Sequence, residues 1–170
     1  MILRPATPAD VPALAALGRD SFVAAFGPLY SAADLSAFLV EVHEDAVVAA
    51  ELAGGTCRTL LAEDAGGLAG YCKLRHPSKL ASHSAARDPN KPRQLYTAPG
   101  RTGQGIGAAL MDWALGEAAA GGHDAVLLSV YSGNPGAQRF YARYGFAKIA
   151  DITFRVGSQL DAEYLYEKRL

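Results

Sequence analysis

The chain has 170 residues, half of them apolar, and its 16 basic side chains stand against 17 acidic ones for a net charge of −1. This length suits a single domain over residues 1–170, and the balance of charge argues against nucleic acid or an anionic membrane as a partner. No apolar run approaches the roughly 20 residues of a membrane span, and the N-terminus lacks the pattern of a secretory signal, so we expect a cytoplasmic protein.

Taken in chain order, the expected elements are a strand over residues 2–6, a helix to about residue 17, helical segments within 20–53, a hairpin over 57–63 and 68–74, a strand over 94–98, a helix to about 120, a strand over 124–131, a helix that ends at 145, and strands over 146–156 and 160–167. Thr7 is a suitable N-cap for the first helix, and Gly18 is a suitable end. The order predicts an α/β fold: a mixed sheet of about six to seven strands with helices on both faces.

Residues 75–93 form the longest segment without a periodic apolar pattern. The segment holds three prolines, and five basic residues stand against Asp88 as its single acid. We predict a polar loop, which is long enough to favour a functional or disordered role over a plain connection.

A glycine-rich stretch between residues 94 and 110 is the most informative part of the chain. An apolar run leads into a Pro/Gly break, glycines follow at positions 103, 105 and 107, and an apolar helix begins directly behind them. Glycine lacks a Cβ, so an anionic ligand can approach the backbone closely, and a helix N-terminus offers unpaired N–H groups and the positive end of its dipole. The pattern predicts a phosphate-binding loop; a plain connecting turn is the alternative.

Three kinds of phosphate loop compete for this stretch. A nucleotide P-loop needs a lysine behind its last glycine, and none is present. A dinucleotide fingerprint matches Gly103, Gly105 and Ala108, and Asp124 lies at the spacing expected of the acid that binds the ribose. That acid should close an apolar run, however, and Asp124 opens one.

The third kind is the pyrophosphate loop of the GNAT superfamily of N-acetyltransferases, whose motif P-x-x-[QR]-G-x-G-I-G resembles residues 99–107. Where the motif has Arg or Gln, this chain has Thr102, and its Arg101 lies one position before that place. The second GNAT signature, N-x-x-A-x-x-F-Y-x-x-x-G-F, resembles residues 134–146. Two motifs in the right order make the resemblance specific, and it implies the GNAT fold along nearly the whole chain.

The resemblance implies transfer of an acetyl group from acetyl-CoA, as donor cosubstrate, to a primary amine of a small molecule. In the family, the loop holds the pyrophosphate and the strand before it pairs with the pantetheine arm, and a tyrosine at the position of Tyr141 protonates the departing thiolate. N-capping of a helix alone would explain Asn134. The resemblance adds a contact between its side chain and the cofactor. The implied cofactor-binding residues are Leu95, Tyr96, Thr97, Thr102, Gly103, Gln104, Gly105, Ile106, Gly107, Ala108 and Asn134.

The acceptor and the general base stay open at this point. Segments near Gly27 and over residues 154–170 also look like bacterial polyamine N-acetyltransferases of the PaiA type, for which an acidic acceptor site is expected; the acids available on the early helices are Glu41, Glu44 and Asp45. If the basic loop over 75–93 lines the same cleft, its positive charges would repel a polycation, which argues against a polyamine acceptor.

The glutamate that family members often carry on the central strand is missing, because Arg93 and Gln94 precede Leu95. Glu41, Glu44, His76 and a water relay remain as candidates. The missing base and Thr102 slightly favour a rival interpretation, in which the chain is a CoA-binding module with a sensing role and little catalysis. The presence of Tyr141 argues against this interpretation.

The histidines and cysteines predict no metal site and no disulfide. The four histidines share no ligand-like spacing, and Cys57 and Cys72 are expected to be buried thiols. A homodimer is left open.

Overall fold

The computed structural model describes residues 1–170. Its strands and α-helices in chain order are β1 (Ile2–Pro5), α1 (Val11–Phe26), α2 (Ala32–His43), α3 (Asp45–Ala53), β2 (Cys57–Asp64), β3 (Gly67–Arg75), β4 (Pro89–Thr97), α4 (Ile106–Ala120), β5 (Ala125–Tyr131), α5 (Pro135–Arg143), β6 (Ala147–Val156) and β7 (Gln159–Arg169). None of these helices is both long and apolar enough to cross a membrane.

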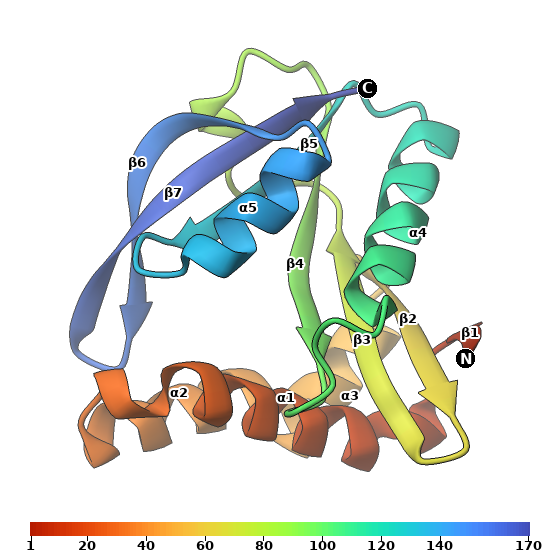
Figure 1. Ribbon diagram of the computed structural model, residues 1–170, viewed down its shortest axis with the longest axis vertical. Helices are drawn as coiled ribbons and strands as arrows, with labels where there is room; N and C mark the ends of the chain where they lie inside the picture. The colour runs from red at the N-terminus through yellow and green to blue at the C-terminus, as the bar shows by residue number, and fades with distance from the viewer.

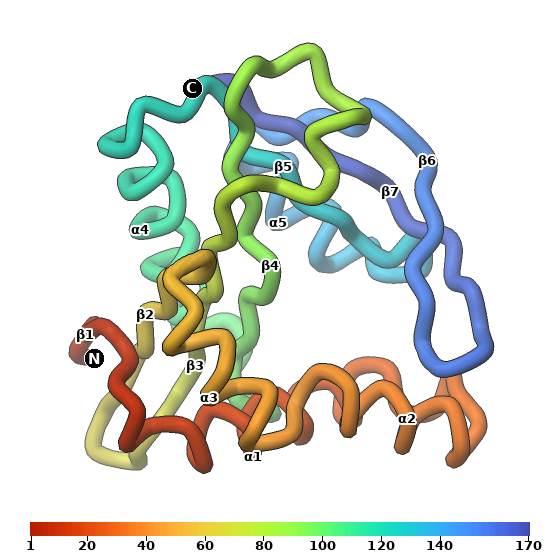
Figure 2. The backbone as a smooth tube through the Cα atoms, turned by 180° about the vertical axis from the view of Figure 1, so that it is seen from behind, coloured from red at the N-terminus to blue at the C-terminus, as the bar shows by residue number.

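The seven strands form one mixed sheet in the order β1-β2-β3-β4-β5-β7-β6, in which only β4 and β5 run parallel. The helices α4 and α5 lie on one face, and α1, α2 and α3 lie on the other, as Figures 1 and 2 show from opposite sides. The predicted mixed sheet with helices on both faces is therefore confirmed.

Alternating side chains of the central strands supply both layers of the core. Leu60 and Cys72 pack beneath α4 with Leu110. Their sequence neighbours Leu61 and Tyr71 point to the opposite face and pack with residues of α1 and α3. Because side chains of a strand alternate between faces, strands that are covered on both sides need nearly continuous apolar runs, which β2 and β3 have.

The first helix is longer than its sequence predicts. It continues through Gly18 to Phe26, so the prediction that Gly18 ends it is wrong. A Cβ at Gly18 would lie 2.4 Å from Nδ1 of the buried His43 and 2.8 Å from the hydroxyl of Tyr71. Gly18 thus serves close packing of α1 against these side chains and is not a helix terminator.

The strand before the glycine loop is also longer than predicted, since β4 begins at Pro89 and not at residue 94. The pairing with β3 shifts register between Lys73 and Leu74, which face Gln94 and Pro92, so the strand accommodates a proline at a bulge. Residues 76–88 remain as the connection, and it lies at the end of β4 opposite the glycine loop (Figure 2).

The two central strands separate after a short contact. β4 pairs with β5 only through Pro89 and Asn90, opposite Ala125 and Val126. Beyond these residues the strands splay apart, and the sheet opens between them (Figure 1). This gap provides the space for the candidate site.

Candidate active site

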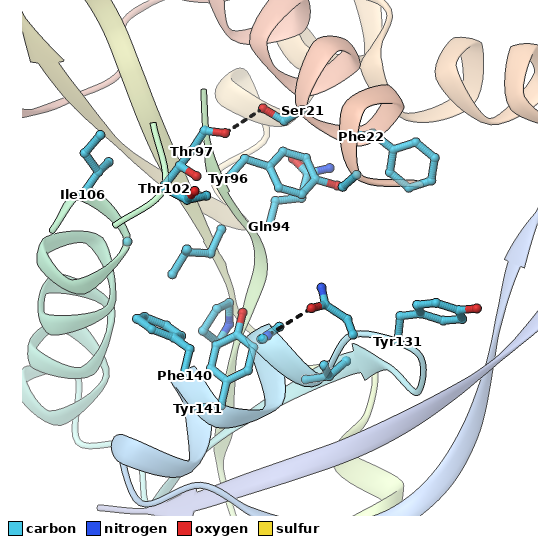
Figure 3. Close-up of a pocket in the computed structure, with 18 of the residues that line it drawn as sticks. Ser21, Phe22, Gln94, Tyr96, Thr97, Thr102, Ile106, Tyr131, Phe140 and Tyr141 are labelled. Carbon is cyan, nitrogen blue, oxygen red and sulfur yellow. Dashed lines mark hydrogen bonds between the residues drawn. The ribbon is translucent and has the colours of Figure 1, made fainter. Parts of the chain in front are cut away.

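A cavity of about 900 Å³ occupies the gap between β4 and β5. On the side of α4 and α5 it is lined by the glycine loop, by Leu95 and Thr97 of β4, and by α5. On the side of α1 and α2 it is lined by α1, Tyr96 and the ends of β5, β6 and β7 (Figure 3). The cavity therefore passes through the sheet and connects its two faces.

The glycine loop adopts a backbone that favours glycine. Gly103 and Gly105 both have φ of +80°, a region that side chains with a Cβ rarely adopt. Gly105 is the N-cap of α4, and nothing lies within 4 Å of a Cβ built on either residue. The loop thus presents open backbone toward the cavity at the positive end of a 15-residue helix.

The side chain of Arg101 is held by the neighbouring hairpin. Its guanidinium pairs with Asp64, the last residue of β2, and this contact, together with the N–H of Gly66, lowers the pKa of Asp64 to about 2. The Nη2 and Nε atoms also donate to Oε1 of Gln104, at 3.2 and 3.3 Å. Arg101 and Thr102 line the cavity and Gln104 does not, so Gln104 is the one predicted cofactor-binding residue outside the cavity lining.

The edge of β4 that faces the gap has backbone groups available beyond Asn90. On its other edge, Leu95, Tyr96 and Thr97 pair with β3. The carbonyl of Thr97 accepts a hydrogen bond of 3.1 Å from the Ser21 hydroxyl, which connects α1 to the end of the strand. An extended ligand could add to this open edge by backbone hydrogen bonds.

The residues of the second motif lie across the gap on α5. Asn134 caps the helix, because its Oδ1 accepts from the backbone N–H of Ala137 at 3.0 Å, and it also lines the cavity. The ring of Tyr141 packs edge-on against Phe140 and Phe146, with centroids 5.2 and 5.9 Å away. The rings of Tyr141 and Phe140 therefore border the same cavity. Burial raises the pKa of Tyr141 above its usual value.

A carboxylate that the sequence did not single out lies on the other face of the sheet. Glu163 of β7 pairs with Tyr131 of β5, and both line the cavity. The Oε2 atom of Glu163 is buried without a hydrogen-bond partner. Burial raises the pKa of Glu163, while Ser129 and the charge of Lys91 lower it in part. With Oε2 buried and unpartnered, this carboxylate favours its protonated form more than an exposed glutamate does.

Aromatic side chains line the cavity on the same face as Glu163. Phe22 and Phe26 of α1 have centroids 5.2 Å apart, and Phe26 meets Tyr131 edge-on at 6.1 Å. Phe154 of β6 completes this wall of the cavity. The splay of β4 from β5 opens the space that these side chains line.

The residues that the sequence offered as bases or acceptor-binding acids lie elsewhere. Glu41, Glu44, Asp45 and His76 do not line the cavity. Of the basic loop over 75–93, only Pro92 and Arg93 reach it, and Arg93 pairs with Glu51. The loop therefore neither forms the acceptor wall nor faces the glycine loop.

Comparison with known proteins agrees with this geometry. A family model described as an acetyltransferase (GNAT) domain matches residues 55–148. An uncharacterized N-acetyltransferase of Mycobacterium tuberculosis is 32% identical over 162 residues, which cover 95% of this chain and 98% of the relative. Another, of Lactobacillus delbrueckii subsp. lactis, is 26% identical over 164 residues, which cover 95% of this chain and 92% of the relative.

Solved structures share the whole fold. The PaiA N-acetyltransferase of Thermoplasma acidophilum, crystallised in complex with coenzyme A, has a TM-score of 0.81 at 19% identity and covers 99% of this chain and 98% of its own. A GCN5-related N-acetyltransferase of Rhodopseudomonas palustris has a TM-score of 0.78 at 24% identity, with 99% and 95% covered. The family model and the mycobacterial relative confirm the resemblance of both motifs: the chain belongs to the GNAT acetyltransferase family, enzymes that take their acetyl group from acetyl-CoA.

Proposed function

We propose that this protein transfers the acetyl group to a primary amine carried on an apolar stem. The observation that supports this is the single cavity through the sheet, with Tyr141 on one face and Glu163 among aromatic side chains on the other. Donor and acceptor can enter from opposite faces and meet between β4 and β5. Holding two reactants in such a geometry can contribute about 7–11 kcal/mol to lowering the barrier.

The donor belongs on the face of α4 and α5. Backbone N–H groups of residues 102–108 and the α4 dipole suit a pyrophosphate, and the open edge of β4 suits the amide groups of a pantetheine arm. The open space above Gly105 supports this placement. In this arrangement Thr102 contributes its backbone, and Arg101 holds the loop to the hairpin through Asp64.

Tyr141 is proposed as the group that protonates the departing thiolate. It borders the cavity from the donor face, and its raised pKa keeps the phenol protonated at neutral pH. Tyr96 also lines the cavity, and burial raises its pKa above the usual value. The sulfur gains the proton of Tyr141 as the carbon–sulfur bond breaks, and a proton released from the amine nitrogen restores the phenol through solvent.

Glu163 is proposed as the first proton acceptor. An alkyl amine with a pKa near 10.4 arrives protonated and must lose a proton before its nitrogen can attack. The buried, unpartnered Oε2 of Glu163 can accept that proton, and its raised pKa brings the carboxyl closer to neutral pH, where a general base works best.

Replacement of Glu163 by glutamine should lower kcat by about 10²-fold, at the low end of the range for a general base because water can relay protons. The wild-type profile of kcat against pH should rise as Glu163 loses its proton. Because the pKa of Glu163 is raised, this acid limb should lie at a higher pH than an ordinary glutamate would give. The limb should be absent from the Glu163→Gln profile. A glutamine at Glu167, a carboxylate on the same strand outside the cavity lining, serves as the matched control. An unchanged acid limb in Glu163→Gln would refute the assignment.

The acceptor wall favours an apolar amine over a polycation. Glu163 is the only acid of the cavity lining, and four aromatic side chains line the cavity on the same face of the sheet: Phe22, Phe26, Tyr131 and Phe154. The polyamine hypothesis depended on acids of α2 and α3, none of which lines the cavity.

A panel of amines tests this choice by thiol release from acetyl-CoA. We expect phenethylamine and hexylamine to have a kcat/KM at least about tenfold above that of spermidine, since each methylene buried contributes about 0.8 kcal/mol and a second ammonium finds no carboxylate. Faster turnover of spermidine would restore the polyamine hypothesis. Absence of turnover with every amine, together with tight binding of acetyl-CoA, would favour a sensing module.

A further inference from the structure

A second cluster of chemically active side chains lies far from the cavity. Nε2 of His76 is 2.7 Å from Oδ1 of Asp88, and Nδ1 of His123 is 2.9 Å from Oδ2 of the same carboxylate. The two imidazole rings have centroids 4.4 Å apart. One ligand atom from each of the three residues lies within 4.8 Å of the others.

The cluster joins three segments at one end of the molecule. His76 follows β3, Asp88 directly precedes β4, and His123 lies between α4 and β5. Figures 1 and 2 show this end, where the connection over residues 76–88 passes near the C-terminal end of α4, opposite the glycine loop. None of the three residues lines the cavity between β4 and β5, so acetyl transfer does not account for them.

Backbone hydrogen bonds hold each of the three residues in place. The N–H of His76 donates to Thr56 at 3.2 Å, and the N–H of His123 donates to Ala118 at 3.1 Å. The N–H of Asp88 donates to Oδ1 of Asp124 at 2.9 Å. The side chains therefore converge from backbones that are already fixed, which lowers the entropy that a ligand must overcome.

Two imidazole nitrogens and one carboxylate oxygen form a donor set typical of zinc and similar divalent metals. Ligand atoms about 2.0–2.2 Å from a tetrahedral Zn²⁺ lie about 3.3–3.6 Å apart, so small side-chain rotations suffice to admit the ion. We propose that His76, Asp88 and His123 form a divalent transition-metal site, with Zn²⁺ as its typical occupant, that fastens the 76–88 connection to the end of α4.

The surrounding charges are compatible with a cation. The carboxylate of Asp88 contributes a negative charge between the two imidazoles, as an aspartate does at neutral pH. Arg87 and Arg169 lie near, but both approach Asp124, at 3.8 and 3.9 Å. The side chains of His76 and Asp88 are 43% and 54% exposed, which leaves a path for the ion and room for water as a fourth ligand.

Calorimetric titration of the untagged, metal-free protein with ZnCl₂ tests the site. We expect one Zn²⁺ per chain, no heat with MgCl₂, and an affinity at least about 100-fold weaker in His123→Ala and in Asp88→Asn, since loss of even a supporting partner costs about 10–100-fold. The matched control is His83→Ala, which removes an exposed histidine of the same connection and should bind Zn²⁺ as the wild type does. Absence of binding to the wild type, or equal losses in all three variants, would overturn the proposal.

Thermal unfolding supplies a second test, in which stability replaces the heat of binding as the readout. A ligand that binds only the folded state at 100 times its Kd stabilises that state by about 2.7 kcal/mol. Zinc should therefore raise the Tm of the wild type and of His83→Ala, and EDTA should reverse the effect. Asp88→Asn keeps the shape of its side chain, and its Tm should not respond to zinc. An equal response in Asp88→Asn would place the metal elsewhere.

Discussion

Replacement of Tyr141 by phenylalanine is expected to lower kcat by about 10²–10⁴-fold, while the KM for acetyl-CoA stays near its wild-type value. The change keeps the ring and its edge-on contacts with Phe140 and Phe146, which lie 5.2 and 5.9 Å away between centroids. Only the phenolic hydroxyl, and with it the proton donor, is lost. Because burial raises the pKa of Tyr141, the wild-type phenol is protonated through the neutral range and can donate.

Steady-state kinetics with a saturating amine, together with an unfolding curve, measure this effect. Tyr144→Phe is the matched control, since it removes a hydroxyl from the residue that follows the same helix but lies outside the cavity lining. The Tyr144 hydroxyl donates to Asp112 at 2.9 Å and not into the cavity, so its loss should cost about 1 kcal/mol of stability and leave kcat nearly unchanged. Wild-type kcat in a folded Tyr141→Phe would mean that water protonates the thiolate and that Tyr141 only packs.

Replacement of Gly105 by valine is expected to weaken acetyl-CoA binding by about 10²–10⁴-fold. The new side chain would project into open space of the loop, where nothing of the protein lies within 4 Å of the Cβ position. A pyrophosphate excluded from this space would lose at least two charge-assisted hydrogen bonds to backbone N–H groups. At about 1.5–3 kcal/mol each, that loss corresponds to two to four orders of magnitude in Kd.

Backbone strain complicates this variant and calls for a matched control. Gly105 has φ of +80°, so valine also destabilises the loop conformation itself. Gly122, at the other end of α4, has φ of +76° and equally open surroundings. Gly122→Val should therefore show a similar loss of stability with unchanged affinity for acetyl-CoA. Calorimetry that finds unchanged affinity in a folded Gly105→Val would reject the pyrophosphate assignment.

The errors of the sequence-based prediction have local physical causes. Gly18 is a good helix end by its intrinsic propensity, but close packing against His43 requires a glycine within α1. Pro89 and Pro92 suggest a loop by composition, yet β4 accommodates them at its start and at a bulge. In each case a contact with a distant segment overrides a correct statement about local preference.

Glu163 was missed although the sequence contains a weak signal for it. Asp161, Glu163 and Leu165 alternate along β7 and share one face of the strand. Leu165 is fully buried on that face, so acids in phase with an apolar core position indicate buried carboxylates. The signal is weak because the same alternation also fits an exposed edge strand.

The sequence by itself determined the family and predicted the residues of the proposed donor half of the site. The glycine loop, the helix behind it and the capped helix of Asn134 depend on short-range features, namely positive φ, helix N-termini and capping, that neighbouring residues specify. Only the tertiary structure revealed the residues of the proposed acceptor half and the histidine cluster. The splay of β4 from β5 exposes Glu163 to the cavity, and the sheet order brings His76, Asp88 and His123 together. Both depend on strand pairing between distant segments, which no local pattern encodes.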